Sequence, residues 1–510
     1  MHLMRTGDEA QARQSLERAF KIDPYDKVTF NLLALLDSLD KFVEIREGDI
    51  ILKLHPAEAP VMREYAMPLA QEALKTLSAK YNFTPKGPIL VEIFPKHDDF
   101  AVRTLGLPGM IGALGACFGR VVSLDSPRVE GRPPGSFSWQ ATLWHEMAHV
   151  ITLQMSNQRI PRWLTEGISE YEETKARPDW GREMEIPFAL ALERGKALKL
   201  ADLNSGFTRP DTIALAYYEA SLLVDHIVQT YGQPKLHALV KSYGEGLEGN
   251  DAIEKRIGVT LPELQTSFDK ALDARFGTIR AALRAIPGAT EGGGRGRPAP
   301  TDINALRSAA QANPGNYEAQ LAYGHVLAAA GDRAAFEPLE KAAALVPGAT
   351  GEESPHAVMA RLAEQLGDTQ RAIAEYRALL AQDHTALDAA RSLAALAEKT
   401  KAQPVLMQAY ERIVAIDPFD PSAHSGLGRL ALATNQPQTA IREFKAALAI
   451  GPTDKAAAHC DLGEAYLLAS RPADAKAEAL AALEIAPSFD RAQELLLRSI
   501  KGSGAPGDRQ

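Results

Sequence analysis

The chain has 510 residues, enough for about three domains, and its composition of 45% hydrophobic and 24% charged residues is that of an ordinary soluble globular protein. The net charge is −9 and no basic block could follow a phosphate backbone, which argues against a nucleic-acid partner. Cys117 and Cys460 lie far apart and no long apolar run occurs, so we predict no structural disulfide, no cysteine zinc site and no membrane span.

Residues 1–41 are expected to form a helical N-terminal segment. Gly7 to Asp26 predicts an amphipathic helix ending at Pro24, and its pattern resembles the second half of a tetratricopeptide (TPR) repeat. One half-repeat cannot bury its own apolar face, so we expect it to pack on the next domain or on residues upstream. No signal peptide is visible. Whether the native N-terminus lies upstream stays open, with the cytoplasm as the default compartment and the periplasm if a leader is missing.

The period of the apolar residues changes at Phe42 from that of helices to that of strands. Residues 42–56 alternate around Gly48-Asp49 and predict a hairpin. A helix is expected over about 57–81, and the apolar runs 88–95 and 118–125 predict buried strands. A small sheet is therefore expected in this part of the chain.

The pattern H-E-x-x-H follows, formed by His145, Glu146 and His149. Residues four apart stand one turn above each other on a helix, so both imidazoles can point at a single ion. The pattern lies on a predicted helix with one buried side, because apolar residues recur there at helical spacing: Trp139, Leu143, Met147, Val150 and Leu153. The alternative is a chance pentapeptide on an ordinary core helix.

A second amphipathic run, 163–174, follows a predicted turn at 157–161 and contains Glu166. A helix, a sharp turn and an antiparallel helix would bring the Glu166 carboxylate back to the two histidines. Two imidazoles and one carboxylate suit a catalytic zinc ion, which takes three protein ligands and leaves a fourth position for water. Glu146 would lie beside that position, where it could take a proton from the water.

The stretch HEMAH followed by WLTEGISEY resembles the gluzincins of the peptidase MA clan, which include aminopeptidase-N-like and thermolysin-like zinc metallopeptidases. The resemblance implies that His145, His149 and Glu166 bind one Zn²⁺ ion and that Glu146 is the general base. It also suggests that Glu170, one turn beyond Glu166, accepts a hydrogen bond from a ligand imidazole and fixes its tautomer.

In gluzincins a small sheet covers the zinc, and its edge strand holds an extended substrate by backbone pairing. Gly112 to Arg120 is our candidate for that strand and its approach, because its Gly and Ala residues would let a substrate backbone come close. A flexible loop leading into a core strand is the alternative. The aminopeptidases carry a G-x-M-E-N run here, whose Glu binds the substrate's amino terminus, and this chain has no such motif. We therefore expect an endopeptidase rather than an aminopeptidase.

The predicted helix at 213–232 resembles the one on which these enzymes keep a hydrogen-bond donor for the oxyanion of the transition state. Tyr217 matches the tyrosine of their Y-x-K-G-A pattern, although Glu219 and Ala220 replace its Lys and Gly. Tyr218 and His226 are the alternative donors. Adjacent tyrosines and a single histidine on such a helix also suit plain packing roles.

The segment 286–302 has the Gly and Pro density of a flexible linker. Beyond it, prolines stand 33, 71, 34 and 35 positions apart: Pro314, Pro347, Pro418, Pro452 and Pro487. Small residues keep the same step, which is the TPR signature of about 34 residues, with Asp383-His384 in place of one turn proline. We expect five repeats at about 317–350, 354–386, 387–420, 421–454 and 455–488. The concave face of such a solenoid usually binds a protein or an extended peptide; a plain spacer is the alternative.

The expected fold is therefore mainly α: an α+β gluzincin-like metallopeptidase domain with a small sheet and a helical subdomain, followed by an α-solenoid of TPR repeats. The expected domains are 1–41 (partial TPR), 42–285 (metallopeptidase-like), 286–302 (linker), 303–500 (TPR) and 501–510 (disordered tail). The expected function is zinc-dependent hydrolysis of peptide bonds, with a protein partner held by the repeats. The alternatives are a catalytically silent TPR scaffold that keeps the zincin fold, and zinc-dependent hydrolysis of another kind of bond.

Overall fold

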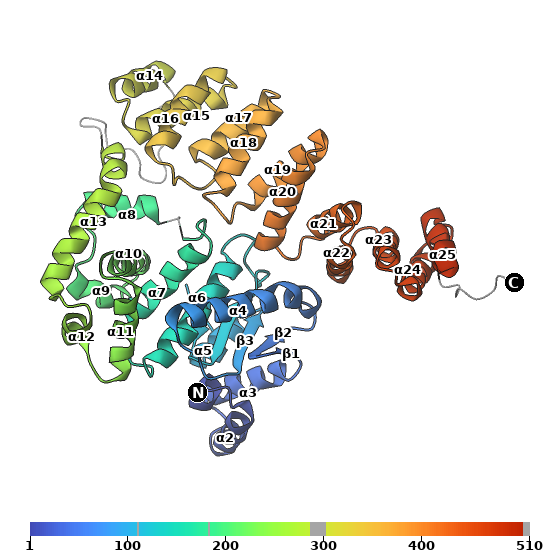
Figure 1. Cartoon of the computed structure of the whole chain (residues 1–510), viewed down its shortest axis with the longest axis horizontal. Helices are drawn as coiled ribbons and strands as arrows, with labels where there is room; N and C mark the ends of the chain where they lie inside the picture. Colours follow the sequence, from blue (N-terminus) through green and yellow to red (C-terminus); the bar gives the residue numbers. More distant parts are fainter. Residues whose placement is uncertain (110–111, 182–183, 286–301, 503–510) are drawn as a thin grey trace.

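The computed structural model describes residues 1–109, 112–181, 184–285 and 302–502 (Figure 1). The predicted fold class is confirmed: helices dominate, a small sheet lies in the N-terminal half, and a solenoid of helix pairs follows. The predicted linker, 286–302, and tail, 501–510, fall mostly outside the described residues, so the domain boundaries stay predictions. Among the described residues, no helix is both long and apolar enough to cross a membrane.

Within the described ranges, five strands form one sheet in the order β1-β2-β3-β5-β4. Their bounds are β1 Val43–Glu47, β2 Ile50–Leu54, β3 Ile89–Phe94, β4 Gly115–Cys117 and β5 Val121–Asp125. The predicted hairpin is the antiparallel pair β1–β2, and the two predicted buried strands are β3 and β5, which pair in parallel. The short strand β4 pairs antiparallel with β5 and forms one edge of the sheet.

Alternate residues of β3 face the two sides of the sheet, because successive side chains of a strand point in opposite directions. Ile89, Val91 and Ile93 join the main core, where α4 (Ala59–Tyr81) and α6 (Trp139–Met155) pack against the sheet. Phe94 joins a smaller core on the other side, with α3 (Lys27–Leu39) and α5 (His97–Leu105). The N-terminal segment, α1 (His2–Arg5) and α2 (Glu9–Ile22) together with α3, thus packs on the sheet domain as expected.

A helical subdomain follows the sheet. Its helices are α7 Arg162–Ala176, α8 Glu185–Glu193, α9 Leu200–Gly206, α10 Ile213–Tyr231, α11 Gln233–Gly244, α12 Gly249–Arg256 and α13 Leu261–Ala282. The two predicted helices that bear the candidate site, α6 and α7, differ from the expected ranges by only a few residues at their ends. Both lie in one core with α4 and α10.

The solenoid begins with α14 (Ile303–Ala312) and ends with α25 (Asp490–Gly502). Between them, each of the five predicted repeats holds one helix pair, and one of them carries an extra short 3-10 turn. The pairs are α15 Tyr317–Ala329 with α16 Phe336–Leu345, α17 Pro355–Gln365 with α18 Thr369–Leu380, α19 Leu387–Thr400 with α20 Gln403–Ile416, α21 Pro421–Ala433 with α22 Pro437–Ile450, and α23 Lys455–Leu468 with α24 Pro472–Ile485.

The solenoid is docked on the sheet domain by buried side chains. Trp139, the first residue of α6, is fully buried and its indole N–H donates to the carbonyl of Ala415 at the end of α20 (3.0 Å). The Tyr65 hydroxyl of α4 donates to the buried Glu443 carboxylate of α22 (2.9 Å). In Figure 1 the solenoid accordingly runs over the α4–α6 side of the sheet domain and then extends away from it.

A substitution at Gly428 tests how closely the paired helices α21 and α22 cross. A Cβ at this position of α21 would lie 2.5 Å from Cε1 of the buried Phe444 ring on α22. We expect Gly428→Ala to lower the free energy of unfolding by about 1–3 kcal/mol through overpacking. The matched control is Gly277→Ala in α13, where a Cβ meets nothing within 4 Å; it should stabilise by up to about 1 kcal/mol through helix propensity. Chemical denaturation measures both, and equal effects would contradict the crossing.

Glu219 predicts a pH-dependent stability. Burial raises the pKa of this carboxyl to about 8, although the backbone N–H of Leu198 donates to it (2.9 Å). The folded state therefore holds a proton that the unfolded chain has released above pH 4.5. The contribution of Glu219 to the free energy of unfolding is therefore fully present below pH 4.5. It falls towards pH 8 by up to about 1.4 kcal/mol per pH unit. In Glu219→Gln the slope of denaturation free energy between pH 5 and 8 should be smaller than in the wild type, and buried Glu58, whose pKa is raised to about 7, should account for part of what remains. An unchanged slope would exclude Glu219 as a source.

Candidate metal centre

The two helices of the site are set antiparallel by the turn between them. Ser138 caps α6, where its hydroxyl accepts from the backbone N–H of Ala141 (3.1 Å). After α6, Asn157 and Gln158 adopt left-handed conformations (φ 49° and 64°), and Pro161 precedes the first residue of α7. This tight reversal sends α7 back along α6, as the sequence predicted.

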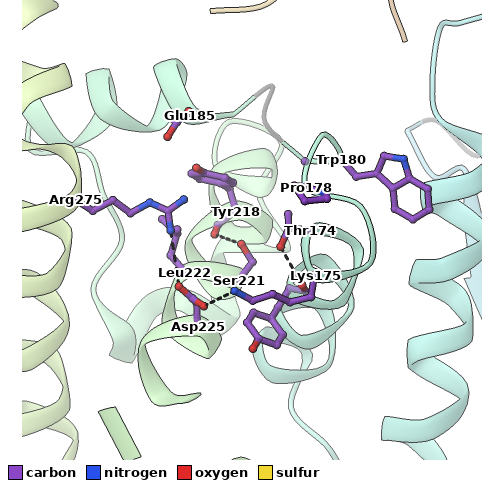
Figure 2. A pocket seen from close by; sticks show the side chains of 12 residues that line it. Thr174, Lys175, Pro178, Trp180, Glu185, Tyr218, Ser221, Leu222, Asp225 and Arg275 are labelled. Atoms are coloured by element: carbon purple, nitrogen blue, oxygen red, sulfur yellow. Dashed lines mark hydrogen bonds and ion pairs between the residues drawn. The ribbon is translucent and has the colours of Figure 1, made fainter. Parts of the chain in front are cut away.

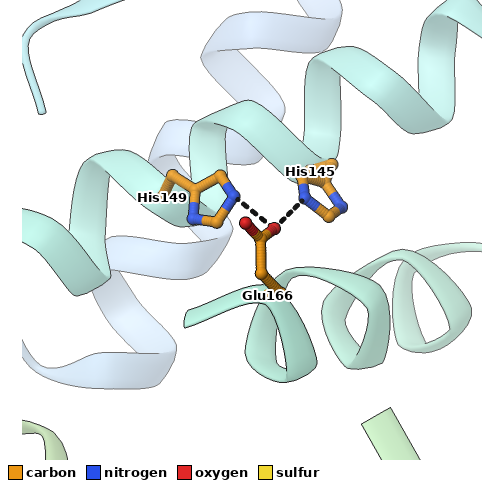
Figure 3. A group of neighbouring side chains, drawn as sticks. All are labelled: His145, His149 and Glu166. Atoms are coloured by element: carbon orange, nitrogen blue, oxygen red, sulfur yellow. Dashed lines mark hydrogen bonds and ion pairs between the residues drawn. The ribbon is translucent and has the colours of Figure 1, made fainter. Parts of the chain in front are cut away.

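The reversal brings three predicted metal ligands together. The Nε2 atoms of His145 and His149 each lie 3.2 Å from Oε2 of Glu166, so both imidazoles point at one carboxylate oxygen (Figure 3). One donor atom from each of the three residues lies within 4.8 Å of the others, close enough for a single cation. All three side chains are largely buried, with 10–12% of each side chain exposed.

The Nδ1 atoms of both histidines also form hydrogen bonds, on the side of each ring away from Glu166. Nδ1 of His145 donates to the Glu173 carboxylate (2.6 Å), and Nδ1 of His149 forms a hydrogen bond with the Thr165 hydroxyl (2.8 Å). These bonds fix the rings so that both Nε2 atoms face Glu166. The residue predicted from the sequence to accept a hydrogen bond from a ligand imidazole is Glu170. The structure gives the bond on His145 to Glu173, because His145 lies one turn before His149 and therefore meets α7 further along its length. A Glu170 carboxylate oxygen lies in the same cluster, within 4.8 Å of donor atoms of His145 and Glu173.

Glu146, the predicted general base, lies between the metal-ligand cluster and the edge strand. Its side chain is 5% exposed, and its Oε2 atom has no hydrogen-bond partner among the described residues. A Cβ on Gly115, the first residue of β4, would lie 2.5 Å from Oε1 of Glu146. Only glycine therefore lets the edge strand pass this close to the carboxylate, which gives the Gly-rich segment at 112–120 a structural reason.

The site concentrates negative charge in a buried place. Burial lowers the pKa of His145, but its hydrogen bonds to Glu166 and Glu173 outweigh this and raise the pKa well above its usual value. Burial raises the pKa of Glu146, with His149 and His145 acting in the opposite direction. Burial also opposes ionisation of Glu166, yet the two histidines bring the pKa of that carboxyl below its usual range. Surroundings that favour a proton on His145 in this way also favour a cation.

Tyr217 reaches the site from α10. Its hydroxyl accepts from Arg162 (3.4 Å), a residue whose Nε donates to the second oxygen of Glu166 (3.3 Å). The rings of Tyr217 and His145 have centroids 6.3 Å apart. Burial, with the charge of Glu166, raises the pKa of Tyr217 to about 12, so the hydroxyl stays protonated as a donor requires. Gly167 permits this approach, since a Cβ there would lie 2.6 Å from the carbonyl oxygen of Ala220 on α10.

The two alternative donors lie elsewhere. Tyr218 is buried and packs edge-on against Phe188, with centroids 5.4 Å apart. His226 forms hydrogen bonds with Ser267 (2.9 Å) and Thr230 (3.3 Å). Nine residues of helix separate it from Tyr217, about 13 Å along the axis, so it cannot face the same carboxylate. Of the adjacent tyrosines, only Tyr217 turns towards the histidines.

The arrangement fits a divalent cation. Two imidazole nitrogens and one carboxylate converge, each imidazole is oriented by a second bond, and the buried Oε2 atom of Glu146 has no hydrogen-bond partner among the described residues. Sequence spacing alone does not identify Thr165, Glu173 and Arg162 as part of the site. Their spacing from Glu166 on α7 was visible, but which of them meets a histidine depends on how the two helices cross.

Family models match two parts of the chain. Residues 70–274 match the model of the Peptidase MA superfamily, and residues 358–421, 388–455 and 425–488 match the model of a tetratricopeptide repeat. None of the curated proteins compared with the chain matches it. Among solved structures, the chain is similar to the MamA protein, with 21% identity over 29% of this chain and 81% of that chain and a TM-score of 0.27.

Another similar structure is that of YrrB, a TPR protein described as having an unusual peptide-binding site. The match has 17% identity over 39% of this chain and 99% of that chain, with a TM-score of 0.28. The chain therefore carries a domain of the Peptidase MA superfamily over residues 70–274, followed by tetratricopeptide repeats that the family model matches over 358–488.

Proposed function

We propose that the chain is a zinc-dependent metallopeptidase of the gluzincin type, with a TPR module that binds protein. The observation that carries the proposal is the convergence of His145, His149 and Glu166 beside the unpartnered carboxylate of Glu146. Zinc bound by the first three residues would supply a Lewis acid that polarises the peptide carbonyl and makes water acidic enough to ionise near pH 7. Both effects would lower the barrier to attack of water on a peptide bond.

The chain's own groups would move the protons. Glu146 accepts a proton from the attacking water as its oxygen adds to the peptide carbonyl carbon, and later passes that proton to the leaving amine nitrogen as the C–N bond breaks. The Tyr217 hydroxyl donates a hydrogen bond to the oxyanion formed between these steps. Arg162 positions that hydroxyl and one oxygen of Glu166.

The substrate would lie along the edge strand β4. An edge strand offers unpaired backbone groups to an extended peptide, and Gly115 places this strand directly against Glu146. The chain lacks the G-x-M-E-N motif with which the related aminopeptidases bind a free amino terminus. Cleavage within a chain, rather than removal of its first residue, is therefore the favoured reaction. The concave face of the repeats is a natural place for a protein partner.

Glu146→Gln tests the general base. The change keeps the size of the side chain and the three ligands but removes the proton acceptor, so we expect unchanged zinc content and at least a hundredfold fall in kcat on casein. Removing zinc from the wild type with a chelator should abolish cleavage, and added zinc should restore it.

Glu130→Gln, a surface change in the loop before α6, is the control and should cleave at the wild-type rate. A Glu146→Gln variant that binds zinc and cleaves as fast as wild type would refute the mechanism. Stoichiometric zinc without turnover in the wild type itself would instead favour a silent scaffold.

Glu173→Gln tests the hydrogen bond behind His145. Loss of the carboxylate charge should loosen the ring and weaken zinc binding by about tenfold or more, as seen when such partners of metal-bound histidines are changed. Glu170→Gln is the matched control on the same helix and should change the affinity much less. Competition with a chromophoric chelator measures both affinities; a larger loss in Glu170→Gln would give the orienting role to Glu170.

A further inference from the structure

The edge strand β4, along which a substrate would lie, is short and weakly held by the sheet itself. It spans Gly115–Cys117 and has β5 as its one neighbour in the described sheet. A substrate paired with β4 must nevertheless be placed accurately beside Glu146, because a misplacement of about 1 Å can cost about a hundredfold in rate. Contacts from outside the sheet are therefore needed to keep β4 in place.

The cavity nearest to the ligand helix α7 does not supply these contacts. It has a volume of about 280 Å³ and is lined by α7, α8, α10, α13 and the loop after α7 (Figure 2). Among the described residues that line it, none is a candidate metal ligand and none belongs to α6 or β4. The position of a substrate relative to Glu146 depends instead on the contact between β4 and α6.

The strand β4 and the turn after it are held to α6 at two places. At one end, Gly115 lies directly against Glu146. At the other end, the side-chain amide of Gln154 donates to the carbonyl of Gly119 (2.7 Å). Eight residues of helix, about 12 Å, separate Glu146 from Gln154. The four residues of chain from Gly115 to Gly119 span up to about 13 Å, which matches that length of helix.

A second glutamine holds the same turn. Gln158 lies in the reversal after α6, where its backbone is left-handed (φ 64°), and its side-chain amide donates to the carbonyl of Phe118 (3.3 Å). A Cβ on Gly119 would lie 2.6 Å from Nε2 of Gln158, so the glycine lets this amide reach the turn. The guanidinium of Arg5, from α1, also lies over the Phe118 ring, 4.9 Å from its centroid.

The amide of Gln154 is fixed by further hydrogen bonds. It also donates to the carbonyl of Lys86 (3.3 Å), and its oxygen accepts from the backbone N–H of Lys86 (2.7 Å), in the loop before β3. Both the donor and the acceptor group of the amide are therefore used, and the donor stays directed at Gly119. A carboxylate at this position would keep the bond from the Lys86 N–H but would turn an acceptor towards two carbonyl oxygens.

We propose that Gln154 and Gln158 are positioning residues that hold β4 against Glu146 and so determine where a bound peptide lies relative to the general base. This rests on the proposed function and deepens it, since it names the groups that align the substrate. Neither glutamine forms a hydrogen bond with the three predicted metal ligands among the described residues. Both act through the backbone of the strand and its turn.

Two hydroxamates test the alignment in zinc-loaded protein without turnover. Acetohydroxamate is small enough to reach the metal and Glu146 alone, whereas a tripeptide hydroxamate also pairs with β4. In isothermal titration calorimetry, Gln154→Glu should bind the tripeptide hydroxamate about tenfold more weakly and acetohydroxamate within about twofold of the wild type. Gln158→Glu should weaken the tripeptide hydroxamate by about threefold, because its bond is longer and exposed.

Gln140→Glu is the matched control. It makes the same change in the first turn of α6, at a side chain that forms no hydrogen bond with a described residue, and should bind both hydroxamates as the wild type does. Equal tripeptide affinity in Gln154→Glu and the wild type, or equal losses for the two hydroxamates, would overturn the proposal.

Amide hydrogen exchange gives a second readout that needs no metal. The N–H of Phe118 donates to the carbonyl of Val121 (2.9 Å) and closes the turn between β4 and β5. In Gln154→Glu this amide should exchange about tenfold faster, while β1, at the far edge of the sheet, should exchange as in the wild type. Unchanged exchange at Phe118 would refute the anchor. If the zinc-loaded wild type binds neither hydroxamate, the proposed function fails, and faster exchange at Phe118 still establishes the anchor.

Discussion

The structure depends on the antiparallel pairing of α6 and α7, which buries several carboxylates next to two imidazoles. Removing carboxylates from water costs several kcal/mol each unless a positive charge compensates them, and here Glu146, Glu166 and Glu173 lie around His145 and His149 with little exposure to solvent. Such an arrangement is stable only with protons or a cation in its centre. The rest of the sheet domain can be understood as the frame that keeps α6 and α7 in this arrangement.

Two glycines let neighbouring elements of this frame approach the site closely. Gly167 of the WLTEG run lets α10 approach α7 until the carbonyl of Ala220 fills the place of a side chain, and this brings Tyr217 beside His145. Gly115 does the same for the edge strand, whose backbone would otherwise be pushed away from Glu146. In both places a residue without a side chain lets a backbone come close to a chemical group, which is the commonest physical reason for glycine inside a regular element.

The repeats are more than an appended module. Trp139, the first residue of α6, is fully buried and bonded to the end of α20, and Asp179 beyond the end of α7 is held by Arg412 and His384. The solenoid therefore touches the start of one site helix and the segment that follows the other. One hydrogen bond, from an indole to a carbonyl, therefore joins α20 directly to the helix that carries the histidines.

Local patterns in the sequence were enough to predict the helices, the hairpin, the repeat pairs and the three residues that could hold a metal, because each depends on spacing along a single element or across one short turn. The family comparison supports the peptidase and repeat assignments. What spacing could not decide is which side chains meet between elements. Glu173 rather than Glu170 bonds His145, Tyr217 rather than Tyr218 faces the site, and His226 lies on Ser267. These outcomes follow from the crossing of α6, α7 and α10, and a crossing is set by packing over the whole core. His384 stands where the repeat pattern usually has a turn proline. That its side chain bonds the carbonyl of Asp179, in the loop after α7, is visible only in the tertiary structure.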